Sequence, residues 1–366
     1  MFGFPPIDIS HVYHVSPNGD DAHSGLADAY PVDVSAGANG VAKETVQAAV
    51  TAASDGDTVL IWPGTYDEEV TVAHEINLMG VHPEQCLIYP STDEGSALTI
   101  SDHNVHVSDL HCKGGTDSGA CGVLVANNKS GIVLDNVWGE SLATAGDGAG
   151  LKGGGLATSK PWTIRNSFFE GKLHGAYFAS ITSYFQFIFE NCGFYTEADV
   201  DAVSYALYCP TLAQINRCSF YMQANGGVNA TKYDRIGLYL LKDAIVRDSL
   251  IQVLGSSSDE GDTYCIEAKE NAIVSNTLMR STATGTGTAY SVKVTDSGDE
   301  MFLQNCLYDR SGTAGSGNVR DMQDENARVD VGRVGGATPQ NFDTLISTLA
   351  QGNTVGQAIK RSAAKR

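Results

Sequence analysis

The sequence lacks long apolar runs and has few basic residues. No stretch of 18 apolar residues occurs, and the opening MFGFPPIDIS has neither the basic start nor the apolar centre of a secretory signal. We therefore expect no membrane insertion and no classical signal peptide. Lys and Arg number 23 against 43 Asp and Glu, which gives a formal net charge of -20. Because this charge repels phosphate backbones, nucleic acid is not an expected partner.

Several motifs of known chemistry are also missing. The chain has no CxxC pair, phosphate-binding loop, dinucleotide fingerprint or nucleophile elbow. Its eight cysteines follow a structural repeat, so we interpret them mostly as free thiols. Cys192 and Cys218 would lie on adjacent rungs, where packing thiols are favoured over a disulfide. Forty glycines against ten prolines indicate many tight turns in a β-rich chain.

An internal repeat predicts the fold. Its anchors are mostly Asn and recur at spacings of 25 to 31 residues: Asp109, Asn136, Asn166, Asn191, Arg217, Asp248, Asn276 and Asn305. The residues two and four positions before each anchor are apolar, and the residue directly before it is polar. This alternation is typical of a strand with one buried face. Small side chains mostly follow the anchors, which indicates a narrow interior.

A second strand precedes each anchor strand, as in YALYC from Tyr205 and GLYLL from Gly237, and a short third side follows each anchor, as in SFF from Ser167. Equivalent strands that recur at this interval stack as parallel rungs of a solenoid. The Asn side chains would then form a ladder, each donating to one rung and accepting from the next. Arg217 and the two Asp anchors have no explanation at this level.

The N-terminal part resembles the opening of pectate-lyase-like right-handed β-helix proteins. The resemblance rests on VSPNGDDAHSG from Val15 and TVQAAVTAASDGDTVLIWPGTYDEEVTV from Thr45. It covers residues 11–80 by motif, and residues 81–312 by the repeat alone. It implies a helix that caps the solenoid, and Val46, Ala49, Val50 and Ala53 give that helix an apolar face. The superfamily includes lyases, hydrolases, esterases, epimerases and phage tailspikes, so the resemblance implies a fold rather than one activity.

The predicted fold is therefore an all-β, single-stranded right-handed parallel β-helix of about nine coils. We expect an N-terminal arm and capping helix over residues 1–57, the β-helix over 58–312, and a linker with a basic, partly helical tail over 313–366. In the tail, Phe342, Leu345, Ile346 and Leu349 have helical spacing. From Arg333 onward there are five basic residues and one acidic residue. The tail either plugs the solenoid or docks to another copy or a virion protein.

The strand before each anchor strand carries the candidate binding residues. Its outward positions are Lys152, Tyr177, Tyr208, Tyr239, Glu267 and Lys293. The tyrosines, 31 residues apart, would form a column that stacks on itself or on sugar rings. This stripe is our candidate glycan-binding site.

No catalytic set emerges from the sequence. A glycosidase needs two carboxylates on neighbouring rungs, and Glu267 is the one acid in the stripe. The resemblance to pectin methylesterases would require two Asp with Arg and Gln on this face, and that set is absent. For a lyase, Lys152 could serve as base, but the candidate calcium ligands Glu197, Asp199 and Asp201 are better interpreted as a solvated loop.

The histidines offer two weaker candidates. His103, His106, Asp109 and His111 form the one histidine-rich cluster, but residues three apart on a strand face opposite sides, which disfavours zinc. His174, with Lys172 and Glu170, is a candidate general acid. No metal or cofactor is expected, with calcium as the remaining possibility.

Three classes of function compete. The first is a carbohydrate-facing protein of a phage-like particle, of tailspike, fibre or surface-decoration type, located on a virion or an extracellular surface. The second is a polysaccharide lyase or other depolymerase, which explains the fold equally well but needs a catalytic set. The third is a cellular adhesin or scaffold. Because the acidic body lacks a carboxylate pair on the stripe and carries a basic tail, we favour the first.

Overall fold

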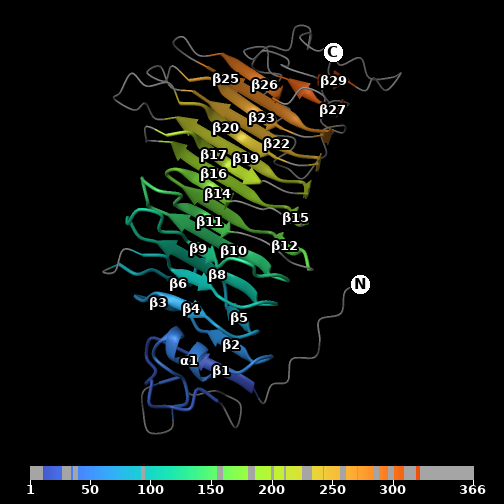
Figure 1. Ribbon diagram of the computed structural model, residues 1–366. Helices are drawn as coiled ribbons and strands as arrows, with labels where there is room; N and C mark the ends of the chain where they lie inside the picture. Colours follow the sequence, from blue (N-terminus) through green and yellow to red (C-terminus); the bar gives the residue numbers. More distant parts are fainter. Residues whose placement is uncertain are drawn as a thin grey trace, which may run out of the picture. The chain divides into compact units, whose positions relative to one another are not determined.

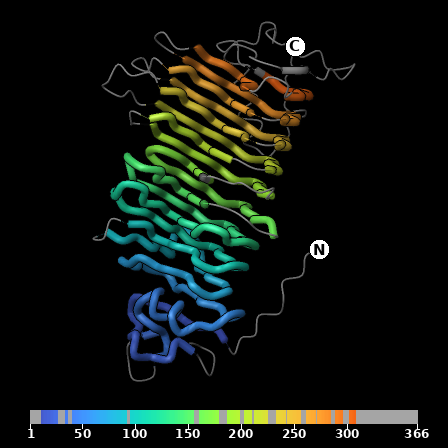
Figure 2. Tube along the Cα trace, viewed as in Figure 1, coloured from blue at the N-terminus to red at the C-terminus, as the bar shows by residue number. Residues whose placement is uncertain are grey.

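A computed structural model (Figure 1) describes residues 11–26, 34–35, 40–91, 95–154, 160–179, 186–198, 202–209, 212–224, 233–241, 243–255, 261–269, 271–283, 288–295, 301–308 and 319–321. The chain divides into two compact units, residues 1–172 with 179–185, and residues 173–178 with 186–366. Within each unit, parallel strands follow one another in coils, as the tube in Figure 2 shows. We call the three sides of a coil the anchor sheet, the following sheet and the stripe sheet, after the sequence features that they carry.

The first unit contains thirteen strands, some of which span two sides of a coil. Its anchor sheet comprises β1 (Val12–Val15), β2 (Thr58–Ile61), β5 (Asn77–Gly80), the first halves of β8 (His106–Gly114) and β10 (Val133–Ser141), and β12 (Trp162–Arg165). Its following sheet comprises β3 (Gly64–Tyr66), β6 (Cys86–Ile88), the second halves of β8 and β10, and β13 (Phe168–Gly171). Its stripe sheet comprises β4 (Val70–Val72), β7 (Leu98–Ile100), β9 (Val123–Val125) and β11 (Ala149–Gly154).

The second unit repeats the pattern. Its anchor sheet comprises β15 (Phe187–Glu190), β18 (Ala213–Asn216), β21 (Ala244–Arg247), β24 (Ala272–Ser275), β27 (Met301–Gln304) and β29 (Val319–Asp321). Its following sheet comprises β16 (Gly193–Ala198), β19 (Ser219–Ala224), β22 (Leu250–Leu254), β25 (Leu278–Thr282) and β28 (Leu307–Tyr308). Its stripe sheet comprises β14 (His174–Ala179), β17 (Ser204–Cys209), β20 (Arg235–Leu240), β23 (Thr263–Ala268) and β26 (Ala289–Val294).

This arrangement confirms the predicted right-handed parallel β-helix. The solenoid has about seven turns, slightly fewer than the nine expected. In two coils the first two sides merge into one nine-residue strand, β8 or β10. The proposed boundaries at residues 57 and 312 stay a prediction. No helix among the described residues is long and apolar enough to cross a membrane.

The predicted capping helix is α1 (Val46–Ala52), with Val46, Ala49 and Val50 buried. The Thr45 side chain accepts a hydrogen bond from the Ala48 N–H at 3.2 Å. The carboxylate of Glu68 also accepts from the N–H groups of Val46 and Gln47, at 2.7 and 2.9 Å. These contacts satisfy the free donors of the first helical turn, and α1 packs against β1, β2 and β4.

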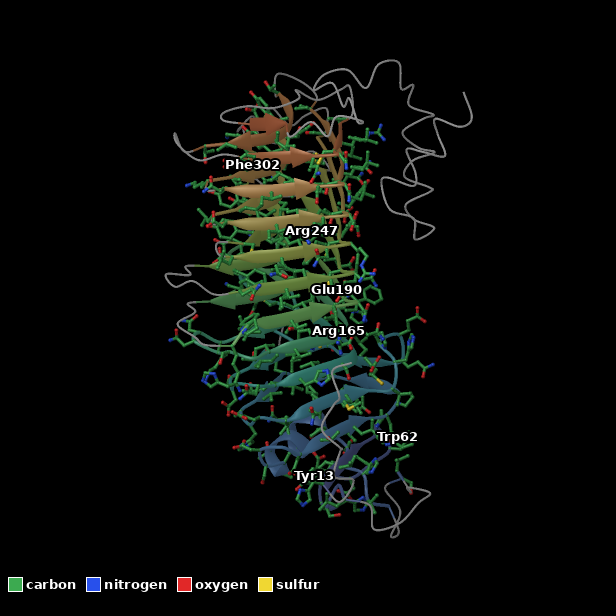
Figure 3. All side chains as sticks on the ribbon, turned by 90° about the vertical axis from the view of Figure 1, so that its right-hand side faces the viewer. Tyr13, Trp62, Arg165, Glu190, Arg247 and Phe302 are labelled. Carbon is green, nitrogen blue, oxygen red and sulfur yellow. The ribbon has the colours of Figure 1, made fainter. Side chains whose placement is uncertain are left out.

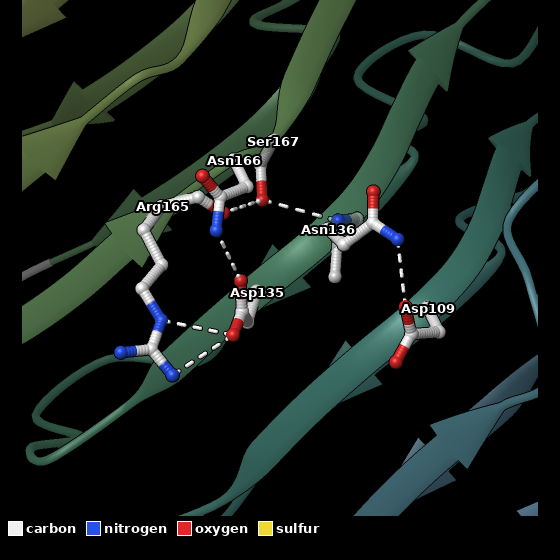
Figure 4. A network of polar contacts seen from close by, with 7 residues as sticks. Asp109, Asp135, Asn136, Arg165, Asn166 and Ser167 are labelled. Atoms are coloured by element: carbon white, nitrogen blue, oxygen red, sulfur yellow. Dashed lines mark hydrogen bonds and ion pairs between the residues drawn. The ribbon is translucent and has the colours of Figure 1, made fainter.

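The anchors share one backbone conformation. All eight have φ between 49° and 56°, the left-handed region that Asn and Asp enter most readily after glycine. Asn136 Nδ2 donates to Asp109 Oδ1 at 2.6 Å, but Asn166 Nδ2 donates to Asp135 Oδ1 at 2.9 Å rather than to Asn136 (Figure 4). The carboxamide ladder is therefore partial, and the repeated left-handed bend is the more general feature.

The exceptional anchors now have an explanation. Asp248 accepts a hydrogen bond from Asn276 Nδ2 at 3.1 Å, as Asp109 does from Asn136. Arg217 forms an ion pair with Glu190, which Figure 3 labels on the anchor edge of the coils. Each exception therefore contacts a polar side chain of a neighbouring rung, although its chemistry differs from that of an amide ladder.

The small residues after the anchors stabilise the bend through their own polar atoms. Ser167 Oγ donates to the Arg165 carbonyl at 2.7 Å and accepts from the Val137 N–H at 3.1 Å. Ser249 makes the same pair of bonds with Arg247 and Cys218. All eight cysteines are buried thiols outside disulfide bonds, which confirms their interpretation. The predicted tail helix, with Phe342, Leu345, Ile346 and Leu349, lies outside the described residues.

We expect Asn136→Ala to lower the free energy of unfolding by about 2 to 3 kcal/mol, since alanine both loses the bond to Asp109 and disfavours φ of +54°. Asn136→Gly is the matched control, because glycine accepts this φ and loses only the bond. Urea unfolding of the two variants measures the difference. Equal stability of Asn136→Ala and wild type would contradict the role of the bend.

Candidate functional site

Five of the six predicted stripe residues occupy matching positions on adjacent strands of the second unit. We call such a row of matching positions a file. Tyr177 pairs with Tyr208, Tyr208 with Tyr239, Tyr239 with Glu267, and Glu267 with Lys293. The file therefore crosses β14, β17, β20, β23 and β26 in register. The sixth residue, Lys152, lies on β11 of the first unit, where its ammonium is 3.4 Å from the Asp147 carboxylate.

The three tyrosines stack on one another. The ring centroids of Tyr177 and Tyr208 are 4.8 Å apart, and those of Tyr208 and Tyr239 are 4.9 Å apart with an interplanar angle of 6°. Neighbouring rings therefore cover the ring faces. A ligand could contact only the ring edges and the hydroxyl groups of these tyrosines. Tyr239 and Glu267 are each only 7% exposed, so the centre of the stripe is buried rather than open as expected.

A second file on the same face was missed by the sequence interpretation. It contains His174, Tyr205, Ile236, Tyr264 and Tyr290, each three positions before a stripe residue. In a regular strand such residues would face opposite sides. Here the pairing between strands skips one residue per strand, for example Ala206 in β17. Ala206 and Leu207 are consecutive and both buried, so the alternation of faces is interrupted there. The interruption brings both files to one face. The recurrence of a residue three positions before each stripe residue was the sequence signal that could have predicted the second file.

The two files form one aromatic cluster. His174 stacks on Tyr177 with centroids 4.7 Å apart, and Tyr205 contacts Tyr208 and Tyr239 edge to face at 5.0 and 5.5 Å. At the other end of the files, Tyr264 stacks on Tyr290 at 5.1 Å. Pairs in these geometries stabilise by about 0.5 to 1.5 kcal/mol beyond the area that they bury. Self-stacking thus accounts for the position of the rings.

Lys293 connects the charged end of the stripe to this cluster. Its ammonium lies 4.2 Å from the centroid of the Tyr264 ring, 3.2 Å from the Tyr264 hydroxyl and 3.4 Å from Glu267 Oε1. Burial raises the pKa of Glu267 even though Lys293 opposes this change. Burial also raises the pKa of Tyr205 and of Tyr264, with nearby phenols and carboxylates adding to the effect. The cluster therefore favours neutral phenols.

The histidine and calcium candidates gain no support as ion sites. Among the described residues, no three His, Cys, Asp or Glu side chains are grouped so as to hold a metal ion. His103 Nδ1 instead lies 3.0 Å from Ser130 Oγ. Glu197 lies on β16, but Asp199 and Asp201 fall outside the described residues. Calcium binding stays untested.

Comparison with known proteins finds likeness at the level of fold. No protein-family model and no curated protein sequence matches the chain. Similar solved structures include pectin methylesterase PemA from Erwinia chrysanthemi, 16% identical with a TM-score of 0.46, covering 86% of this chain and 99% of that one. The enzyme from carrot is 11% identical with a TM-score of 0.45, covering 77% and 85%. That from Yersinia enterocolitica is 14% identical with a TM-score of 0.43, covering 77% and 94%.

Alkaline titration should destabilise the second unit. Folding raises the pKa of Tyr205, so the neutral phenol contributes to the stability of the folded state. This contribution is fully present below the usual tyrosine pKa of about 10 and is lost as the pH rises from there through the pKa of the folded state. Urea unfolding from pH 8 to 11 should therefore show falling stability, with a smaller fall in Tyr205→Phe. Parallel pH curves for the variant and wild type would contradict this assignment.

Proposed function

We propose that the stripe sheet of the second unit recognises a glycan chain without cleaving it efficiently. The observation that carries the proposal is the file of Tyr177, Tyr208, Tyr239, Glu267 and Lys293 on five adjacent strands. Strands spaced about 4.8 Å apart place these groups over about 19 Å, the length of several sugar residues. A polymer of repeating sugars can make the same weak contact with each rung of the file, and the free energies of these contacts add.

The chemistry of recognition follows from the stacking. Since the ring faces are covered, sugar hydroxyls would meet phenol hydroxyls and ring edges, and each hydrogen bond contributes about 0.5 to 1.5 kcal/mol. Lys293, whose side chain is 26% exposed, adds a cation that suits a glycan with some negative charge. Glu267 is the single carboxylate among the described residues of the stripe, so the carboxylate pair that hydrolysis requires is missing from this file.

We propose further that the chain acts as a surface protein of a phage-like particle, of tailspike, fibre or decoration type. The support is the opposition of charge along the chain. Five basic residues and one acidic residue lie from Arg333 onward, whereas the preceding 332 residues have 18 basic and 42 acidic residues. A basic segment on an acidic body favours attachment to another copy or to another virion protein.

The glycan proposal predicts that hydroxyl groups, rather than ring faces, supply affinity. We expect Tyr177→Phe with Tyr208→Phe to weaken binding about 5-fold to 100-fold, by loss of two hydrogen bonds, while stacking is retained. The matched control is Tyr195→Phe with Tyr221→Phe, a stacked pair with centroids 5.4 Å apart on the following sheet. Binding to alginate, polygalacturonate and dextran by microarray or calorimetry provides the measurement.

Unchanged binding by the first pair would show that the tyrosines only support one another. Cleavage that disappears in Glu267→Gln would show instead that the stripe is catalytic.

The particle proposal predicts that the tail holds an assembly together. We expect a chain ending at Thr313 to have a lower molar mass in light scattering than the full chain at the same concentration, with an unchanged β-sheet circular dichroism spectrum. Added salt should also lower the molar mass of the full chain, because salt screens the charge pairs that hold the assembly together. A full chain that is monomeric throughout would contradict the proposal.

A further inference from the structure

The outer face of the following sheet in the first unit carries a second group of titratable and aromatic side chains. Two files cross β8, β10 and β13 in register. One contains Lys113, Glu140 and Glu170, and the other contains His111, Trp138 and Phe168. The first file lies four residues after the anchors Asp109, Asn136 and Asn166, and the second lies two residues after them. The bend therefore sets both files in place.

Glu140 is the charged partner of this group. Lys113 Nζ lies 2.7 Å from Glu140 Oε1, and His111 Nε2 lies 3.3 Å from Glu140 Oε2. Although burial alone would raise the pKa of Glu140, contacts with His111 and Lys113 outweigh it and lower the pKa. The Glu140 side chain is 15% exposed, so its carboxylate is held ionised close to the surface.

Glu170 is the second carboxyl group of this surface. It occupies the rung next to Glu140, about 4.8 Å along the solenoid, and no ion pair joins it to a cation among the described residues. Burial and the neighbouring Glu140 charge both raise its pKa. The indole N–H of Trp138 is buried and interacts with this carboxyl without completing a well-formed hydrogen bond. The pKa values of two adjacent carboxyl groups are thus shifted in opposite directions, the arrangement that acid–base catalysis needs.

An open aromatic surface adjoins the carboxyl pair. Trp138 is stacked on His111 with centroids 4.1 Å apart and contacts Phe168 edge to face at 6.2 Å. Phe168 is 39% exposed and, two residues before Glu170 on β13, shares its face of the strand. An exposed ring beside a carboxyl pair offers a sugar ring a stacking surface next to the reacting groups.

We propose that Glu140 and Glu170 hydrolyse a glycosidic bond of a polysaccharide laid across β10 and β13. Glu170 donates its proton to the glycosidic oxygen while a Glu140 oxygen attacks the anomeric carbon, so the bond from that carbon to the leaving sugar breaks and an ester to Glu140 forms. Glu170, now a carboxylate, takes a proton from water, and the resulting hydroxide attacks the anomeric carbon and releases Glu140. One water is consumed, and we expect the configuration to be retained, because Glu140 and Glu170 hold paired positions on adjacent strands and closely spaced carboxyl groups give retention.

Lys113 and His111 are positioning residues in this scheme. They lower the pKa of Glu140 and restrain its carboxylate, while burial and the Glu140 charge raise the pKa of Glu170. The site lies on a different sheet and in a different unit from the stripe, so it does not depend on the proposed function. Loss of either activity can be observed with the other intact.

The test measures reducing ends released by the full chain from alginate, polygalacturonate, dextran and a bacterial capsule preparation. We expect Glu170→Gln to lower the rate 100-fold or more and to remove the fall in rate at alkaline pH. Glu140→Ala should also lose turnover, and added azide should restore it by replacing the missing nucleophile. Glu197→Gln, on the following sheet of the second unit, is the control and should cleave like wild type.

A second readout does not depend on protonation of the leaving group. Dinitrophenyl glycosides of the active sugar need little acid assistance, so Glu170→Gln should release a first equivalent of dinitrophenol nearly as fast as wild type does. Its later turnover should be slow, because Glu170 also takes the proton from the attacking water. Glu140→Ala should show no such burst. Circular dichroism melts exclude unfolding as the cause. The proposal is overturned if none of the polymers is cleaved, or if both variants cleave at the wild-type rate.

Discussion

The left-handed residue at the eight anchors, from Asp109 to Asn305, is the constraint on which the rest of the structure depends. With φ near +50°, it turns the chain from the anchor sheet into the following sheet at the same point of each coil that carries an anchor. Asn and Asp tolerate this conformation at low cost, and the Ser or Cys that follows bonds back across the bend. Because a slip of one residue would exchange the two faces of a strand, the bend fixes which side chains are buried.

Fixed register turns the surface into files of neighbouring side chains. Groups that recur at one position stack about 4.8 Å apart whether or not they attract one another. For Tyr208 and Tyr239 the result is favourable stacking that covers the ring faces. For Glu140 and Glu170 the result is a pair of neighbouring acids. Contacts with Lys113 and His111 lower the pKa of Glu140, while burial and the Glu140 charge raise the pKa of Glu170. The same geometry thus stacks phenol rings in one place and sets two carboxyl groups side by side in another.

The two proposed sites differ in the groups that each presents at its surface. The stripe offers length and hydroxyl groups with one carboxylate, Glu267, whose pKa is raised by burial. The carboxyl pair offers acid and base together beside the exposed Phe168 ring, over only two rungs. Extended contact suits retention of a polymer, and a compact acid–base pair suits cleavage. A protein that both holds and trims a surface glycan would use the two separately.

Local rules let the sequence determine the coils, the anchor positions, the three sides and the helix at Val46–Ala52, because alternation, helical spacing and the Asn preference act within a few residues. The alignment of the tyrosines followed from the same repeat. Only the tertiary structure decided that Asn166 bonds to Asp135, that Tyr239 is buried, and that Tyr205 joins the stripe face. These outcomes depend on contacts between neighbouring rungs and on an interruption inside each stripe strand. The sequence of one coil, taken alone, does not specify such contacts.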